Sequence, residues 1–164
     1  ITYKEVFPLI KDNYLWFGAS IHSGDREFQV PESYPLNAAG YRIDEQGRKF
    51  IRVKGVRWFT NLDYKERHED LILYKSYNPE EYPKYDNYDA IEVSKTADIP
   101  CDYDGVMGVP ITFLDKYNPE QFEIINGIGR YACIDDGNVN PVGTYGTDIN
   151  GEHTYFRIFI RKKQ

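Results

Sequence analysis

The chain has 164 residues, which is enough for one domain with a real hydrophobic core. Its net charge of −6 argues at first against a nucleic-acid partner. No apolar run reaches transmembrane length and no signal peptide is present, so the sequence predicts a cytoplasmic protein with no membrane partner.

The charges are unevenly distributed along the chain. Residues 42–67 hold eight Lys/Arg against four Asp/Glu, whereas residues 69–125 hold four against thirteen. Salt confines the influence of each charge to about 10 Å, so a basic face can bind DNA despite an acidic total. We therefore keep double-stranded DNA as a partner to be considered.

The N-terminal residues predict a helix followed by a short strand. Apolar residues recur at three-and-four spacing over Thr2–Lys11, and Pro8 there requires either a late helix start or a kink. Tyr14–Phe17 reads as a strand. Residues 18–40 have no consistent period, so we expect a loop with a short strand at Glu27–Val30.

A basic β-hairpin is predicted next. Tyr41–Ile43 and Arg48–Val53 flank the turn Asp44–Gly47, which ends in a glycine, and a further strand is expected within Val56–Leu62. Two interpretations stay open, a ribbon that contacts phosphate or an ordinary solvated hairpin. The candidate DNA-binding residues are the basic side chains of this region and of the C-terminal strand: Arg42, Arg48, Lys49, Arg52, Lys54, Arg57, Arg157 and Arg161.

The middle of the chain predicts short strands at Leu71–Tyr74 and Ala90–Val93. Asn78–Glu81 has the Asn-Pro-Glu pattern that starts a helix. We expect the aromatic loop Tyr82–Asp89 to pack beneath its own backbone rather than stack on bases.

The last third predicts a strand, a helix and a hairpin. Val109–Leu114 has the length and content of a buried strand, and Asn118–Gln121 repeats the helix-starting pattern. Asn150-Gly151 predicts a tight turn before the strand Thr154–Arg161. In that strand we expect one face in the core and the other to present Arg157 and Arg161.

No catalytic or metal-binding residue is predicted. The three histidines, at positions 22, 68 and 153, have no partner at metal or triad spacing, and we interpret them as surface residues. The two cysteines, Cys101 and Cys133, match no metal spacing. A disulfide between them is open, although free thiols fit a cytosolic protein better.

Four stretches, taken together and in order, resemble one family. Gly108–Ile124, which reads GVPITFLDKYNPEQFEI, resembles the C-terminal signature of the EcoRI-type adenine-specific DNA methyltransferases. Three other stretches agree with it: Ile1–Ile10, Trp58–Asp63 and Tyr155–Lys162. The resemblance covers the chain from Ile1 to about Lys163.

Two elements of such enzymes are missing from the sequence. They use an Asn- or Asp-Pro-Pro-aromatic loop to hold the flipped adenine, and this chain contains no Pro-Pro pair. A glycine-rich loop that would cradle S-adenosylmethionine is also absent, since Gly127–Arg130 is only a fragment of one. In the family both elements lie upstream, so we expect no catalytic and no cofactor-binding residue here.

The resemblance implies a fold and a role. The expected fold is mixed α+β, the C-terminal part of a Rossmann-like class I methyltransferase sheet plus a β-rich target-recognition region. Residues 1–62 would form the edge of the catalytic sheet and residues 63–164 the recognition region. The parent would belong to a restriction-modification system and transfer a methyl group from S-adenosylmethionine to adenine.

The resemblance also implies partners for the chain. These are double-stranded DNA and the missing N-terminal catalytic half, and a homodimer through an exposed sheet edge is a further expectation. Alone, the chain would be inactive and would not bind the cofactor. The alternatives are a non-catalytic DNA-binding module and a protein-interaction module.

Overall fold

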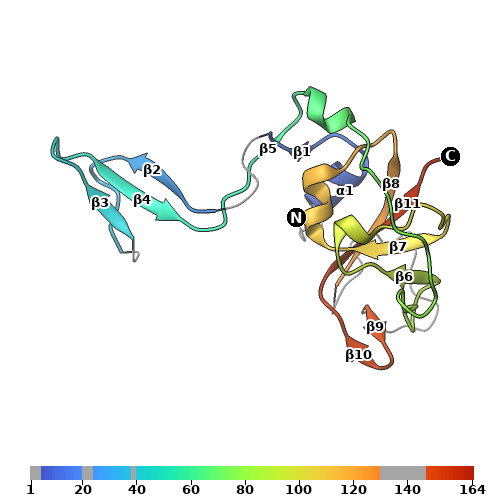
Figure 1. Cartoon of the computed structure of the whole chain (residues 1–164). Helices are drawn as coiled ribbons and strands as arrows, with labels where there is room; N and C mark the ends of the chain where they lie inside the picture. Colours follow the sequence, from blue (N-terminus) through green and yellow to red (C-terminus); the bar gives the residue numbers. More distant parts are fainter. Residues whose placement is uncertain (1–4, 20–23, 38–39, 130–146) are drawn as a thin grey trace. The chain divides into compact units, whose positions relative to one another are not determined.

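A computed structural model describes residues 5–19, 24–37, 40–129 and 147–164. The chain forms two compact units: unit 1 comprises Ile1–Trp16 and Asn61–Gln164, and unit 2 comprises Phe17–Thr60. Strands outnumber helices in the described residues, and this sheet-rich structure with few helices is compatible with the expected mixed α+β class (Figure 1). No helix among these residues is long and apolar enough to cross a membrane.

Unit 1 is built on a four-stranded sheet of order β6-β7-β11-β8 (Figure 1). Its strands are β6 (Ala90–Glu92), β7 (Val106–Val109), β8 (Phe122–Ile128) and β11 (Arg157–Lys162). β6 and β7 are parallel, whereas β11 runs antiparallel to both β7 and β8. The strands predicted within Ala90–Val93 and Thr154–Arg161 are confirmed.

The central strand β11 is buried on both faces. Ile158, Phe159 and Ile160 are each at most 3% exposed. Phe159 packs against Tyr85 and Tyr88, with ring centroids 5.2 and 5.1 Å away. The expectation of one core face and one arginine-bearing face was therefore wrong, because the predicted aromatic loop 82–89 packs over the second face.

The helix α1 (Phe7–Lys11) packs on β8. Residues 5–6 form a turn, so of the two alternatives that Pro8 left open the structure shows the late start. The Phe7 ring lies edge-on to Phe156, and a Cβ at Gly127 would meet both rings at 2.8 Å. The glycine therefore lets the helix approach the strand closely.

Two predicted helix starts are turns instead. At Asn118 and at Asn78 the side-chain oxygen accepts a hydrogen bond from the backbone N–H two residues on, which is an Asx-turn. The same local solution is used twice, as predicted, but it leads to no helix. Asn118 also donates to Asp70, and the Gln121 amide exchanges two hydrogen bonds with the backbone of Leu71. The groups expected to cap a helix therefore bind the segment 70–71.

Two further strand predictions were wrong. Pro110 follows β7 and cannot donate to a ladder, so the strand ends at Val109 and a 3₁₀ helix, η3 (Ile111–Lys116), follows. Leu71–Tyr74 belongs to no strand. The remaining short elements of unit 1 are η1 (Lys65–His68), η2 (Thr96–Asp98), β9 (Asp148–Ile149) and β10 (Glu152–His153).

The predicted Asn150-Gly151 turn joins β9 to β10. Both residues have positive φ, 52° and 79°, as a two-residue hairpin turn requires. The Asp86 carboxylate accepts hydrogen bonds from both of their backbone N–H groups.

Unit 2 carries a three-stranded antiparallel sheet of order β2-β4-β3 (Figure 1). Its strands are β2 (Arg26–Val30), β3 (Tyr41–Ile43) and β4 (Lys49–Val53). The predicted hairpin and the short strand within 18–40 are both confirmed. The segment 56–62 contains only the two-residue strand β5 (Phe59–Thr60), which pairs with β1 (Trp16–Phe17).

Candidate nucleic-acid interface

The hairpin turn of unit 2 is fixed by the residues that predicted it. The Asp44 carboxylate accepts hydrogen bonds from the backbone N–H groups of Gln46 and Arg48, at 3.0 and 2.8 Å. Gly47 has φ of +77°, a conformation that residues with a Cβ rarely adopt. The turn sets the register in which Arg42 lies opposite Phe50, and this register decides which side chains share a face.

One face of this sheet, the polar face, carries three of the predicted DNA-binding arginines. Each forms an ion pair with a carboxylate of unit 2. The pairs are Arg42–Glu27 at 2.9 Å, Arg48–Asp44 at 2.6 Å and Arg52–Asp25 at 2.9 Å. The guanidinium of Arg42 also covers the Phe50 ring at 4.3 Å. The three arginine side chains stay about half exposed, so the face is accessible but its charges are largely neutralised within the unit.

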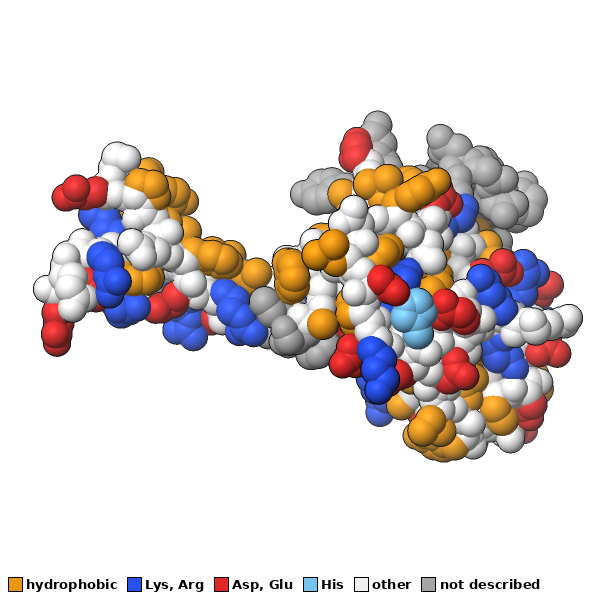
Figure 2. Space-filling view, turned by 90° about the horizontal axis from the view of Figure 1, so that it is seen from above, with side chains coloured by type: hydrophobic (Ala, Val, Ile, Leu, Met, Phe, Trp, Pro, Cys, Tyr) orange, Lys and Arg blue, Asp and Glu red, His pale blue; other side chains and the backbone are white. Residues whose placement is uncertain are grey.

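The opposite face, which we call the apolar face, follows from the same register. Its exposed hydrophobic side chains are 41–54% exposed: Phe28, Tyr41, Ile43 and Val53. Val30 and Ile51 lie between them and are half-buried. In the view of Figure 2, hydrophobic side chains gather along one side of this unit and charged ones along the other.

Two cations stand at opposite ends of the apolar face. Lys49 pairs in register with Val30 and Ile43 at one end, and Arg26 pairs with Val53 at the other. Lys49 donates to the carbonyl oxygen of Glu32, and Arg26 donates to that of Asp25 at 3.0 Å. Among the described residues neither forms an ion pair with a carboxylate, so their charge is not neutralised. Arg26 was not among the sequence-predicted residues.

The two units differ in the sign of their charge. Unit 2 contains seven Lys/Arg against five Asp/Glu, whereas unit 1 contains thirteen against twenty-one. With His counted as neutral, unit 2 therefore has a net charge of +2 and unit 1 has a net charge of −8. Lys54 and Arg57 add to unit 2. Lys54 is exposed, and the Arg57 guanidinium lies 4.8 Å from the Phe17 ring centroid.

The two predicted residues of β11 are placed very differently from the hairpin. Arg161 is about half exposed and bonds Glu123 at 2.6 Å. Arg157 is only 12% exposed and makes a two-pronged contact with the buried Glu92, at 2.6 and 2.9 Å. Glu92 also accepts a hydrogen bond from Tyr85. Arg157 is therefore held inside unit 1.

A buried cluster in unit 1 consists of Glu92, Arg157 and Tyr85, and its two charged members form a structural ion pair. Burial, followed by the hydrogen bond to Glu92, raises the pKa of the Tyr85 hydroxyl. Burial lowers the pKa of Arg157, but the hydrogen bonds to Glu92 outweigh this and the net pKa is raised. Tyr85 and Arg157 thus stay protonated, and Glu92 joins β6 to β11.

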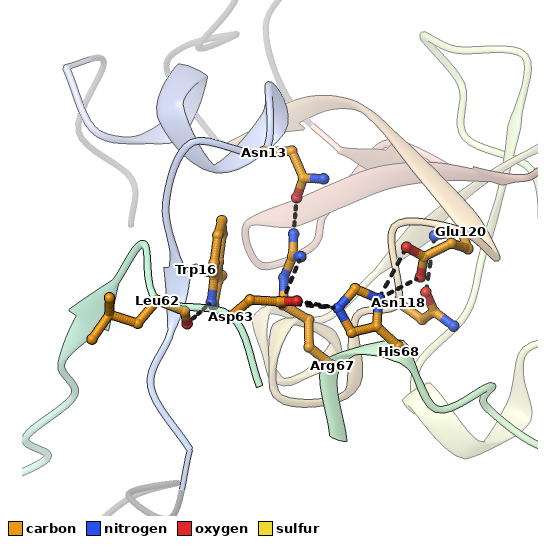
Figure 3. A network of polar contacts seen from close by, with 8 residues as sticks. All are labelled: Asn13, Trp16, Leu62, Asp63, Arg67, His68, Asn118 and Glu120. Atoms are coloured by element: carbon orange, nitrogen blue, oxygen red, sulfur yellow. Dashed lines mark hydrogen bonds and ion pairs between the residues drawn. The ribbon is translucent and has the colours of Figure 1, made fainter. Parts of the chain in front are cut away.

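A polar network in unit 1 was missed from the sequence (Figure 3). His68 bridges two carboxylates, with Nε2 2.8 Å from Asp63 and Nδ1 3.0 Å from Glu120. The neighbouring Arg67 is 7% exposed and its guanidinium lies 3.8 Å from the Trp16 ring centroid. Sequence spacing gave no hint of this, because Glu120 is 52 residues from His68. His153 likewise contacts Asp148, and His22 lies outside the described residues.

The network shifts the pKa values of its members. The hydrogen bonds to Asp63 and Glu120 raise the pKa of His68, and the bond to His68 lowers the pKa of Asp63. His68 therefore favours its charged form, in which both ring nitrogens donate. Three exposed polar side chains do not make a catalytic site, and no group of three metal-binding side chains exists among the described residues.

The glycine that begins the fragment 127–130 is not placed to cradle S-adenosylmethionine. Gly127, the start of the only glycine-rich fragment, lies inside β8 with its Cα hydrogens against Phe7 and Phe156. It is a packing residue and leaves no room for a ligand. Cys101 is an exposed free thiol, and Cys133 lies outside the described residues.

Comparison with known proteins agrees with the resemblance. The family model described as "Adenine-specific methyltransferase EcoRI" matches residues 1–163. The type II methyltransferase M.EcoRI of Escherichia coli is 50% identical over 166 residues, which cover 100% of this chain and 48% of that protein. The type II methyltransferases M.MgeORF184P of Mycoplasma genitalium and M.MpnI of Mycoplasma pneumoniae are each 36% identical, covering 100% of this chain and 54% of theirs.

The chain thus spans about half the length of the relatives it matches. No solved structure matches it. Since the family model covers nearly every residue, the conclusion does not depend on a single motif. The chain belongs to the EcoRI-type adenine-specific methyltransferase family.

Proposed function

We propose that this chain is the C-terminal part of a DNA methyltransferase of a restriction-modification system. The whole enzyme transfers a methyl group from S-adenosylmethionine to a flipped adenine. The observation that carries the proposal is the family match over residues 1–163, in a sequence without the Pro-Pro loop that holds the base. Catalysis then depends on residues outside this chain.

We assign a separate role within such an enzyme to each of the two units of the chain. The boundary predicted at residue 62, between a catalytic edge and a recognition region, lies close to Asn61, where unit 1 resumes, whereas a boundary at Phe17 was not predicted. We propose that the four-stranded sheet of unit 1 extends the Rossmann-like catalytic sheet. Unit 2 supplies the DNA contacts, because it is the unit in which cations outnumber acids.

DNA binding is tested by titrating salt against a complex of this chain with a fluorescent duplex of mixed sequence. Each phosphate contact lowers the affinity by about 0.9 logarithmic units per logarithmic unit of salt. We expect binding that weakens steeply with salt. If no binding occurs even at low salt, unit 2 is not a DNA-binding unit by itself and the proposed role is wrong.

Catalytic incompetence is tested separately, by incubating the purified chain with DNA and methyl-labelled S-adenosylmethionine. We expect no label in the DNA. Transfer of label by this chain alone would contradict the proposal that catalysis needs other residues.

A further inference from the structure

In the part of the chain that the structure describes, no segment covers the apolar face of unit 2. Four of its side chains, Phe28, Tyr41, Ile43 and Val53, are 41–54% exposed although they are large and hydrophobic. Side chains of this kind on one contiguous sheet face mark a surface that binds something. The question is which partner fits it.

The cations at the two ends of the face favour a polyanion. Lys49 and Arg26 lie four residue steps apart in the register of β4, about 14 Å at 3.4 Å per residue. Within the described part of the chain both donate to backbone carbonyl oxygens, which do not neutralise the charge. The polar face differs, because Arg42, Arg48 and Arg52 are already paired with carboxylates.

A second copy of the chain fits this face poorly. Two apolar faces packed together would bury Arg26 and Lys49 of both copies in one interface. These cations have no carboxylate partner among the described residues of the face. Burying unpaired like charges is strongly unfavourable.

The dimensions of the sheet match the major groove of DNA. Three strands at about 4.8 Å spacing are about 10 Å across, which fits a groove about 12 Å wide and exceeds the minor groove of about 6 Å. In the major groove the apolar group that a protein meets is the thymine methyl group. Side chains such as Tyr41 and Ile43 can contact it without a hydrogen bond.

We infer that the apolar face of the β2-β4-β3 sheet lies in the major groove and contacts thymine methyl groups, with Arg26 and Lys49 on the flanking phosphates. The inference rests on the proposed DNA-binding role and specifies its surface. In this arrangement the principal phosphate contacts are Arg26 and Lys49, and not Arg42, Arg48 and Arg52 as the sequence predicted. It also adds a preference for A·T-containing sequence that phosphate contacts alone do not provide.

The decisive experiment changes the DNA and leaves the protein intact. Binding of the wild-type chain is measured by anisotropy to an A·T-rich duplex and to the same duplex with deoxyuridine in place of thymidine, which removes only the methyl group. Burying one methyl-sized group corresponds to about a fourfold change in affinity, so we expect weaker binding to the uracil duplex by at least that factor.

Substitutions then locate the contact. The double variant Tyr41→Ser/Ile43→Ser should bind the thymine duplex several-fold more weakly and should no longer distinguish it from the uracil duplex. The control Tyr34→Ser/Ile72→Ser removes an aromatic and an aliphatic side chain that are 42% and 84% exposed and lie outside the face. It should bind and discriminate like the wild type. Circular dichroism checks that both variants are folded.

The salt dependence separates the two faces. The slope of log affinity against log salt should become shallower in Arg26→Gln/Lys49→Gln by the amount that corresponds to about two phosphate contacts. In Arg42→Gln/Arg48→Gln/Arg52→Gln the slope should stay nearly unchanged. The reverse result assigns the polar face to DNA and overturns the inference. Equal binding of the wild type to both duplexes, or a dimer that the Tyr41/Ile43 variant loses in light scattering, also overturns it.

These outcomes are distinct from failure of the proposed function. If the wild type binds DNA with a steep salt slope but ignores the methyl groups, unit 2 is a DNA-binding unit and only the inference fails. If it binds no DNA at low salt, both fail.

Discussion

The guanidinium of Arg67 lies on the indole of Trp16, with its central carbon 3.8 Å from the ring centroid. The two residues come from segments on either side of unit 2 in the sequence. Arg67 also donates to the side chain of Asn13, and the Trp16 indole N–H donates to the carbonyl of Leu62 at 3.1 Å (Figure 3). The chain segments that leave unit 1 and return to it are thus joined to each other within unit 1.

Replacing Arg67 should destabilise unit 1. The change Arg67→Met removes the cation–π contact and the hydrogen bond to Asn13, and we expect a loss of about 2 kcal/mol. Urea denaturation followed by Trp fluorescence measures it, in a Trp58→Phe background so that Trp16 reports on unit 1. The control Lys65→Met removes an exposed cation two residues away. Equal stability of the two variants would show that the contacts of the Arg67 guanidinium with Trp16, Asn13 and Asp63 contribute nothing.

The stability due to His68 should depend on pH. Its pKa is raised in the folded state by Asp63 and Glu120, so its contribution is fully present below the unfolded value of about 6.5 and is lost as pH rises through the folded pKa. The free energy of unfolding of wild type minus that of His68→Gln should therefore be larger at pH 6 than at pH 9. A difference that stays constant over this range would contradict the bridge.

A titration of the His68 ring by NMR tests the cause directly. In Asp63→Asn the pKa of His68 should fall toward its ordinary value, because the first of its two carboxylate partners is gone. Glu69→Gln changes a nearby exposed acid that does not bond the ring, and it serves as the control. An unshifted pKa in Asp63→Asn would remove that carboxylate from the account.

Breaking the buried Glu92–Arg157 pair should be costly. Arg157→Leu leaves the Glu92 carboxylate, which is 6% exposed, without its cation, and we expect a loss of about 3–5 kcal/mol. The double variant Glu92→Leu/Arg157→Leu should lose less than the sum of the single changes, because no unpaired charge remains buried. Chemical denaturation of all three variants measures the coupling, and strict additivity would contradict it.

The close approach of α1 to β8 predicts a strong response at one glycine. A Cβ in Gly127→Ala would lie 2.8 Å from the rings of Phe7 and Phe156, and the overpacking should cost about 1–3 kcal/mol. Gly129→Ala is the matched control, because its nearest neighbour is one ring atom of Phe156 at 3.2 Å. The melting temperature should fall clearly further for Gly127→Ala than for Gly129→Ala.

The tight turns and the family of the chain could be predicted from the sequence without a structure. Gly47 and Asn150-Gly151 predicted turns whose positive φ values the structure confirms, because few residues adopt that conformation without strain. The family was also identifiable, since four motifs in order are a property of the sequence alone.

Other features depended on partners far away in the chain. Asn118 and Gln121 have the side chains of a helix cap, but Asp70 and Leu71 occupy them and the following residues pair with β11 as a strand. His68 was interpreted as a surface residue and is exposed, but its contacts with Asp63 and Glu120 were not predicted. Arg157 was expected to face outward, although Glu92 holds it inside unit 1.

The physical reason is the same in these cases. A hydrogen-bonding or charged side chain takes the best partner that the folded chain provides, and a partner 48–65 residues away leaves no trace in local spacing. Conformation at turns is decided within a few residues, so the sequence by itself determined the hairpins and the family. Which arginines are neutralised and which cations stay unpaired on the apolar face was decided only by the tertiary structure.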